Sequence, residues 1–218
     1  MIKNFDELFK CMTKPVVAAI YFAIVIVSFI YWDRPVAEFF FQLQLEQHHP
    51  WLLWITRLAW GGLYIVPLLL LTVILRYIVK SDYWKPYFFL WLSVIVPSLV
   101  NLVAKVTFGR SRPTLWLAKA EYGFHWFKTK AVYWSFPSGH TITMMGFVFG
   151  LSVLYPRYLK AFILIGLLVV STRVLLLAHF ISDVMIATYL AMVIVYGLTK
   201  FLKSKARWAQ QLLNAESR

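Results

Sequence analysis

Residues 159–177 read LKAFILIGLLVVSTRVLLL, and this stretch decides the fold. A helix that spans the hydrocarbon core of a bilayer needs roughly 20 mostly apolar residues. From Ala161 onward the stretch is apolar except for Ser171-Thr172-Arg173 near its end, which predicts a transmembrane helix. Since an arginine in such a helix is costly unless it faces a polar cavity or an anion, Arg173 marks a candidate functional site.

Five further stretches have the same apolar character. Hydrophobic residues make up 61% of the 218 residues and charged residues only 14%, against about 25% charged residues in soluble domains. We therefore predict an all-α polytopic membrane protein, a six-transmembrane-helix bundle with short interfacial helices, in a single domain over residues 1–218. The six helices are expected near residues 15–32, 61–79, 86–108, 138–155, 159–177 and 181–202.

The formal net charge of +13 fits a membrane topology better than it fits a nucleic-acid partner. Lys and Arg residues cluster before the first helix, between the second and third, between the fourth and fifth, and after the sixth. Basic residues favour cytoplasmic loops, so this pattern places both termini in the cytoplasm. The compact chain and its short loops suggest the inner membrane of a bacterium, where the protein would be multi-pass.

Three segments outside the spans are expected near the membrane surfaces. Residues 36–58 carry many aromatic side chains and should rest at the outer interface. Residues 201–213 mix Leu, Trp and basic residues and form either a helix on the anionic inner surface or a frayed tail. The loop over residues 114–135 should overhang the candidate site, and its role is left open.

Three clusters that contain ionisable residues lie at the ends of the predicted helices. The first is Lys105, Arg110 and Arg112-Pro113, the second is Phe136–Thr141, and the third is Ser171-Thr172-Arg173, His179 and Asp183. Each has an ordinary explanation alone: cations that reach lipid head groups, a loop-to-helix junction, or a structural His–Asp pair. For Arg110 we expect this reach toward head groups rather than a contact to phosphate.

The second and third clusters have features that suit an anion. Ser138 is a candidate N-cap, and Gly139 leaves the backbone open to close approach. Backbone N–H groups at the start of a helix favour phosphate. His179 and Asp183 are four residues apart, so they share one face of a helix and should form a hydrogen bond.

Topology brings the three clusters to one membrane surface. Counting crossings places the end of the third helix, the start of the fourth, the end of the fifth and the start of the sixth on the same side. By the positive-inside rule, that side is the non-cytoplasmic side of the membrane. The expected site contains Lys105, Arg112, Ser138, Gly139, His140, Arg173, His179 and Asp183. It lacks a carboxylate cluster suited to magnesium, so we expect no metal and no cofactor.

This constellation resembles the type 2 phosphatidic acid phosphatase superfamily of membrane lipid phosphatases. The superfamily pattern is Lys, six residues, Arg-Pro; then Pro-Ser-Gly-His; then Ser-Arg, five residues, His, three residues, Asp. It is matched by Lys105 with Arg112-Pro113, by Pro137–His140, and by Arg173 with His179 and Asp183. One position departs from the pattern, because Thr172 stands where Ser is usual.

The resemblance implies a role for each matched residue. His179 would be the nucleophile that forms a phosphohistidine, and Asp183 would hold its other ring N–H. His140 would protonate the leaving oxygen and then activate water. The phosphate oxygens would be bound by Lys105, Arg112, Ser138, Gly139 and Arg173.

The resemblance leaves the substrate open within the class of lipid phosphates and diphosphates. Undecaprenyl diphosphate is our first choice. Phosphatidylglycerophosphate, phosphatidic acid and lipid A are alternatives, as is a lipid phosphotransferase that passes the phosphate to an acceptor lipid. A transporter is disfavoured, because the polar groups gather at one membrane face. The sequence does not indicate an oligomeric state.

Overall fold

The computed structural model describes residues 2–204 and is helical with no β-strand over that range. The long apolar runs form helices because a chain in a bilayer must satisfy its backbone groups internally. The helices in chain order are α1 (Phe5–Met12), α2 (Pro15–Val27), η1 (Ser28–Trp32), α3 (Asp33–Leu43), α4 (Leu45–His48), α5 (Trp51–Arg57), α6 (Gly62–Val73), η2 (Ile74–Ile78), α7 (Trp84–Phe108), α8 (Pro113–Lys119), η3 (Ala131–Tyr133), α9 (Gly139–Leu154), η4 (Pro156–Tyr158), α10 (Leu159–Leu175) and α11 (Ile181–Lys203).

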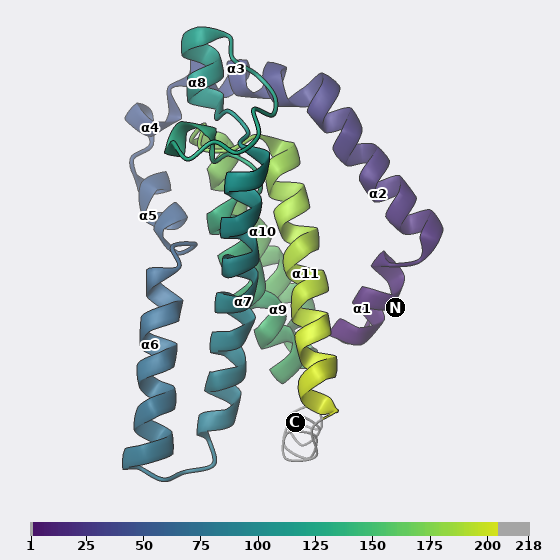
Figure 1. The fold of residues 1–218 in the computed structure, drawn as a ribbon, viewed down its shortest axis with the longest axis vertical. Coiled ribbons are helices and arrows are strands. Elements are labelled where there is room, and N and C mark those ends of the chain that lie inside the picture. Colours follow the sequence, from purple (N-terminus) through teal and green to yellow (C-terminus); the bar gives the residue numbers. More distant parts are fainter. Residues whose placement is uncertain (1, 205–218) are drawn as a thin grey trace.

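The long helices run between two ends of an elongated bundle (Figure 1). α3, α4 and α8 lie at the end drawn uppermost, where α7 also ends. The connection from α6 to α7 and the last turn of α11 lie at the opposite end. The ends of helices that carry the three predicted clusters therefore gather at the upper end of the bundle.

Five helical segments are long and apolar enough to cross a membrane, and they confirm the predicted class of integral membrane protein. They are Pro15–Leu43, Trp51–Ile78, Trp84–Phe108, Pro156–Leu175 and Ile181–Lys203. The remaining predicted span, the fourth in chain order, corresponds to α9, which is apolar but only 16 residues long. At 1.5 Å per residue it is shorter than the hydrocarbon core of about 30 Å, so its first turn lies inside the protein.

The structure differs from the prediction mainly over residues 36–58. This stretch contains most of α3, all of α4 and all of α5. α5 continues toward α6 and belongs to the second apolar segment, so only α3 and α4 stay at the upper end of the bundle (Figure 1). The reason is that Trp51–Arg57 has no helix breaker and can join the following apolar run.

α9 forms the core of the bundle, and 12 of its residues are buried. It packs against α7, α10 and α11. Small residues allow this close approach, because a Cβ added at Gly150 would lie 2.9 Å from Cβ of Ser93 on α7. A tightly packed α9 holds its first turn, Gly139-His140-Thr141, at a defined height in the bundle.

The N-terminal helix packs beside the last helix at the lower end. The rings of Phe9 and Tyr196 stack with centroids 3.5 Å apart, and Asp6 forms an ion pair with Lys200 at 3.0 Å. α1 and the end of α11 therefore lie at the same end of the bundle. The segment over residues 201–213, expected as either a surface helix or a frayed tail, lies mostly outside the described residues.

α2 is largely exposed outside the bundle. It runs obliquely beside the bundle (Figure 1), and Val16, Ile20 and Ile26 are 71%, 56% and 57% exposed. Such apolar side chains suit contact with lipid tails. Midway along α2, the Tyr21 hydroxyl donates a hydrogen bond to the carbonyl of Met185 on α11 at 2.8 Å.

Candidate active site

The three sequence clusters contact one another at the upper end of the bundle. A Cβ added at Gly139 would lie 3.3 Å from Cε of Lys105, so the first and second clusters touch. The N–H of Ser138 donates to the carbonyl of Asp183 at 3.4 Å, which joins the second cluster to the third. Arg112 donates from Nη1 to the carbonyl of Ala178 at 3.2 Å, next to His179.

The ring of His179 is held by a backbone carbonyl. Its Nδ1 lies 2.7 Å from the oxygen of Ser135, whereas the nearest oxygen of Asp183 is 3.9 Å away. The expected direct hydrogen bond from His179 to Asp183 is therefore wrong, because the Ser135 carbonyl occupies that position. A carbonyl can only accept, so Nδ1 carries the proton and Nε2 of the neutral ring keeps a lone pair.

The surroundings of His179 favour its neutral form. The side chain is 2% exposed. Burial, together with the positive charges of Lys105, Arg112 and Arg173, lowers the pKa of His179 well below its ordinary value. Near neutral pH the imidazole is thus unprotonated, and Nε2 makes no hydrogen bond within residues 2–204. That state is the one a nucleophile requires.

Backbone carbonyls of the loop after α8 hold two of the cations. Nζ of Lys105 donates to the carbonyl of Trp134 at 2.6 Å, and Nε of Arg112 donates to the carbonyl of Ala131 at 3.0 Å. The loop over residues 114–135 therefore belongs to the site, where it orients side chains through its main chain.

The third cation comes from α10. Nη1 of Arg173 donates to the hydroxyl of Thr56 at 2.8 Å, while its Nε is buried without a partner in the described chain. Over residues 2–204, none of the three cations Lys105, Arg112 and Arg173 forms an ion pair with a carboxylate. Uncompensated positive charge in a partly buried site favours an anionic ligand.

The first turn of α9 has the predicted cap. Oγ of Ser138 accepts hydrogen bonds from the Thr141 hydroxyl at 2.9 Å and from the Thr141 N–H at 3.4 Å. His140, in the same turn, is half-buried and within electrostatic range of Arg173 and the other two site cations. Gly139 lets Lys105 pass close to the backbone here.

Thr172, the one departure from the superfamily pattern, points its hydroxyl away from the site. The group donates to the carbonyl of Val169 at 2.6 Å and is buried within α10. Because the Thr172 hydroxyl bonds within α10, the side chain of the neighbouring Arg173 is oriented by its hydrogen bond to Thr56.

Arg110 does not reach toward lipid head groups, and that expectation is wrong. Its side chain is 0% exposed and forms ion pairs with Asp183 and, at 2.6 Å, with Asp33. Its Nη1 also donates to the hydroxyl of Ser182 at 2.7 Å. The two buried carboxylates attract the guanidinium inward, away from the membrane surface.

Sequence reasoning missed Asp33 and Ser135 as parts of this site. Asp33 has a weak sequence signal, because a lone carboxylate follows a long apolar run. Ser135 has almost none, since its contact to His179 uses a backbone carbonyl that every residue possesses. The hydroxyl of Ser135 donates to Oδ2 of Asp183 at 2.6 Å, so Asp183 acts on His179 through this residue.

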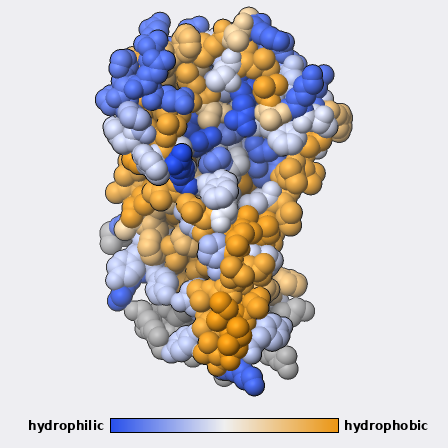
Figure 2. Space-filling model, turned by 90° about the vertical axis from the view of Figure 1, so that its left-hand side faces the viewer, coloured by the Kyte–Doolittle hydropathy of each residue, from blue (hydrophilic) through white to orange (hydrophobic). Residues whose placement is uncertain are grey.

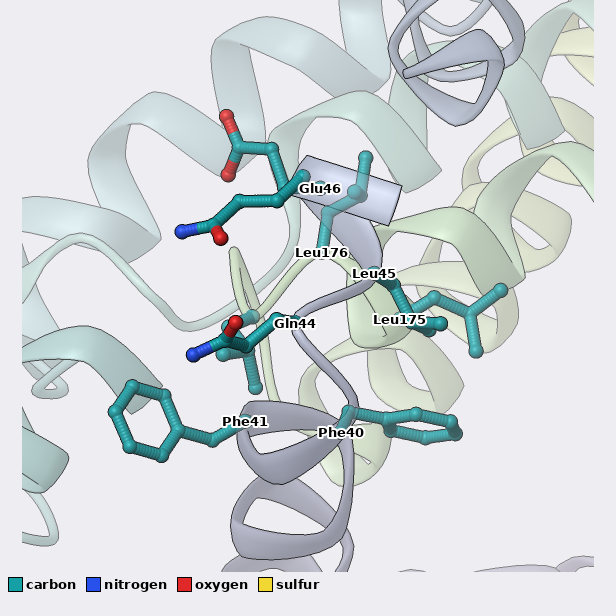
Figure 3. A pocket seen from close by; sticks show the side chains of 9 residues that line it. Phe40, Phe41, Gln44, Leu45, Glu46, Leu175 and Leu176 are labelled. Atoms are coloured by element: carbon teal, nitrogen blue, oxygen red, sulfur yellow. The ribbon is translucent and has the colours of Figure 1, made fainter. Parts of the chain in front are cut away.

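Polar side chains line a hollow in the upper half of one face, above a mainly apolar lower half (Figure 2). A separate pocket of about 370 Å³ lies between the end of α3, the α4 turn and the end of α10. It is lined by Phe40, Phe41, residues 44–47 and Leu175–Leu177 (Figure 3). None of the predicted site residues lines this pocket.

The fold and the site define an integral membrane protein with a histidine and three unpaired cations at one end of a helical bundle. The chain belongs to the PAP2 superfamily, whose family model matches residues 86–207. This match confirms the resemblance drawn from the three sequence clusters, all of which lie inside the matched range.

Two curated proteins resemble part of the chain. A lipid A 1-phosphatase from Rhizobium etli is 35% identical over 96 residues, which cover 44% of this chain and 41% of that protein. A lipid A 1-phosphatase from Rhizobium johnstonii is 34% identical over 96 residues, which cover 44% of this chain and 39% of that protein. The matched segment is thus less than half of either relative. No solved structure matches the chain.

Proposed function

We propose that this protein is a lipid phosphatase that hydrolyses a phosphate monoester or diphosphate of a membrane lipid through a phosphohistidine intermediate on His179. One observation carries the proposal. The hydrogen bond from Nδ1 of His179 to the Ser135 carbonyl leaves the lone pair of Nε2 free, beside three cations without carboxylate partners. This arrangement suits in-line attack on phosphorus within a cluster of positive charge.

In the first step, Nε2 of His179 attacks phosphorus and forms a P–N bond. The P–O bond to the lipid breaks, and the leaving oxygen takes a proton from His140, which enters this step as the imidazolium because the negative charge of the bound phosphate offsets the three site cations. Lys105, Arg112 and Arg173 bind the phosphoryl oxygens on which charge develops, with the first turn of α9 as a further source of N–H donors.

In the second step, water attacks the phosphohistidine. His140, now neutral, takes a proton from that water, and the P–N bond breaks to return the electron pair to Nε2. The products are inorganic phosphate and a lipid that carries one phosphate fewer. Fixed cations bind the phosphate in this scheme, so no metal is assigned. Within residues 2–204 no group of His, Cys, Asp or Glu side chains is arranged to hold one.

The substrate class is a lipid with a terminal phosphate or diphosphate at the outer surface of a bacterial inner membrane. The distribution of Lys and Arg supports that orientation, with both termini in the cytoplasm and the site toward the periplasm. Undecaprenyl diphosphate is the substrate that the sequence favours. The two relatives named lipid A 1-phosphatases add lipid A as a second substrate to test.

A panel of purified lipids tests both the class and the choice of substrate. Phosphate release from undecaprenyl diphosphate, lipid A, phosphatidylglycerophosphate and phosphatidic acid should be measured in detergent with EDTA present. We expect release from at least one lipid, with no loss of rate on adding EDTA. Activity on soluble sugar phosphates alone would defeat the lipid assignment, and label passing to an added acceptor lipid would identify a phosphotransferase instead.

Asp183→Asn should reduce kcat by about 10²- to 10⁴-fold, by analogy with the loss of an orienting carboxylate in a catalytic triad. The carboxylate of Asp183 accepts from Arg110, from the Ser135 hydroxyl and from the Phe180 N–H at 2.9 Å. In the variant, the side-chain NH2 group of asparagine would face one of these donors and could not accept its hydrogen bond. Steady-state rates on the best lipid, with the melting temperature as a check of folding, measure the effect. An unchanged kcat in a folded variant would remove Asp183 from the mechanism.

A further inference from the structure

We propose that Asp33 and Arg110 are positioning residues for His179, acting on it through Asp183 and Ser135; this inference rests on the proposed function and deepens it. Neither residue belongs to the constellation expected from sequence. Both are completely or almost completely buried, at 1% and 0% exposure. A buried ion pair is tolerated where hydrogen bonds compensate for the lost hydration, and the pattern of these bonds shows what the pair holds in place. Arg110 bonds through both Nη atoms, while its Nε has no partner among residues 2–204.

Asp33 caps the start of α11 although it lies 149 residues earlier in the chain. Its Oδ1 accepts the backbone N–H of Ser182 at 3.1 Å, and its Oδ2 accepts the hydroxyl of the same residue. Ser182 is the second residue of α11, where backbone N–H groups have no partner inside the helix. Asp33 thus anchors to α3 the turn that carries His179 and Asp183.

Arg110 joins the carboxylates of Asp33 and Asp183. It bonds Asp33 through Nη2 and Asp183 through Nη1. The rings of Phe29 and Phe180 lie 4.8 Å and 4.6 Å from the guanidinium carbon and exclude water from the pair. With both carboxylates fixed by one rigid fork, Asp183 has a single available orientation.

The chain of contacts ends at the nucleophile. Asp183 accepts the hydroxyl of Ser135 at 2.6 Å, and the carbonyl of Ser135 lies 2.7 Å from Nδ1 of His179. Five residues therefore connect in series: Asp33, Arg110, Asp183, Ser135 and His179. Movement of the first two would reorient the carbonyl that selects the tautomer of His179.

Asp33, Arg110 and Asp183 also carry charges that affect the pKa of His179. Measuring how this pKa changes in variants therefore distinguishes a positioning role from a purely structural one. The charged groups that act on His179 are Lys105 on α7, Arg112 before α8 and Arg173 on α10, and Asp183 on α11 lies 3.9 Å from its Nδ1. Behind Asp183, the carboxylate of Asp33 and the guanidinium of Arg110 add one charge of each sign. Removing one or the other changes the local charge in opposite directions.

The test compares Asp33→Asn, Arg110→Gln and the double variant on the lipid that the wild-type protein hydrolyses best. We expect each single variant to lower kcat by about 10-fold or more with little change in KM, since a contact that orients the nucleophile is lost. The acid limb of kcat/KM should shift to lower pH in Asp33→Asn and to higher pH in Arg110→Gln, by up to about one unit. In the double variant the two shifts should cancel.

Tyr122→Phe is the matched control. The Tyr122 hydroxyl contacts Arg110 at 3.1 Å and Asp33 at 3.3 Å, so its loss disturbs the same network without removing a charge. The acid limb should stay in place in this variant. Inhibition by vanadate and the melting temperature report whether each protein keeps a folded site.

If the acid limb of kcat/KM shifts in the same direction in Asp33→Asn and Arg110→Gln, or does not shift in the folded variants, the proposal is overturned. Asp33 and Arg110 would then be structural residues. If Arg110→Gln does not accumulate, the comparison of Asp33→Asn with Tyr122→Phe decides the question alone. Failure of the proposed function is distinguishable, because wild-type protein would then release no phosphate from any lipid.

Discussion

Replacing His179 with alanine should abolish phosphate release, with a loss in kcat of at least about 10⁴-fold, as when the nucleophile of a catalytic unit is removed. The structure explains the size of this loss. Nδ1 of His179 is committed to the Ser135 carbonyl, and Nε2 is the ring nitrogen left for phosphorus. The other site histidine, His140, is the second residue of α9, and in the proposed mechanism it transfers a proton and does not replace the nucleophile.

The measurement is phosphate release from the best lipid, together with trapping of the intermediate. Rapid quenching with labelled substrate should leave an acid-labile label on the wild-type protein and none on His179→Ala. His48→Ala is the matched control, because His48 is exposed on the short helix α4 and should be dispensable. Residual turnover in His179→Ala close to the wild-type rate would end the phosphohistidine mechanism.

Replacing Arg173 with lysine should lower kcat/KM by about 10²- to 10³-fold, although the charge is kept. The guanidinium already donates through Nη1 to Thr56 and still has free N–H groups for a phosphate oxygen. Lysine carries a single ammonium that cannot contact Thr56 and bind two oxygens in the same geometry. Arg173→Lys should therefore lower kcat/KM although the charge of the site is unchanged.

Arg57→Lys is a suitable control for Arg173→Lys. Arg57 is the neighbour of Thr56 in the chain, but its side chain is exposed and stacks over the Trp54 ring at 4.4 Å. It should retain activity within about twofold, as surface substitutions usually do. A mild effect of Arg173→Lys, similar to that of the control, would mean that Arg173 contributes only charge to the site.

Much of the fold could be predicted because a bilayer restricts the choice of structure. Long apolar runs must be helical, so the starts of α7, α10 and α11 fall within about two residues of the expected positions. The course of residues 36–58 could not be predicted in the same way. Its aromatic and polar residues suit an interface, and only contacts with the rest of the bundle decide which part joins a span.

The candidate site was predictable where side chains act directly. Arg173 and His179 were identified because polar groups at membrane depth are rare. The parts that were missed act through the main chain or through burial. The carbonyl of Ser135 has no sequence signature, and Arg110 looks like any basic residue after a helix until Asp33 and Asp183 are seen on either side of it.

The ion pairs of Arg110 have a consequence for biosynthesis. Asp33 lies in the segment Pro15–Leu43 and Asp183 in the segment Ile181–Lys203, so the guanidinium lacks one of its two carboxylates until the later segment has been synthesised. A nascent chain that stops before Ile181 would keep a half-neutralised arginine next to lipid. We expect such truncated chains to be degraded rather than to persist in the membrane, so that the candidate site assembles only after Ile181–Lys203 has been inserted.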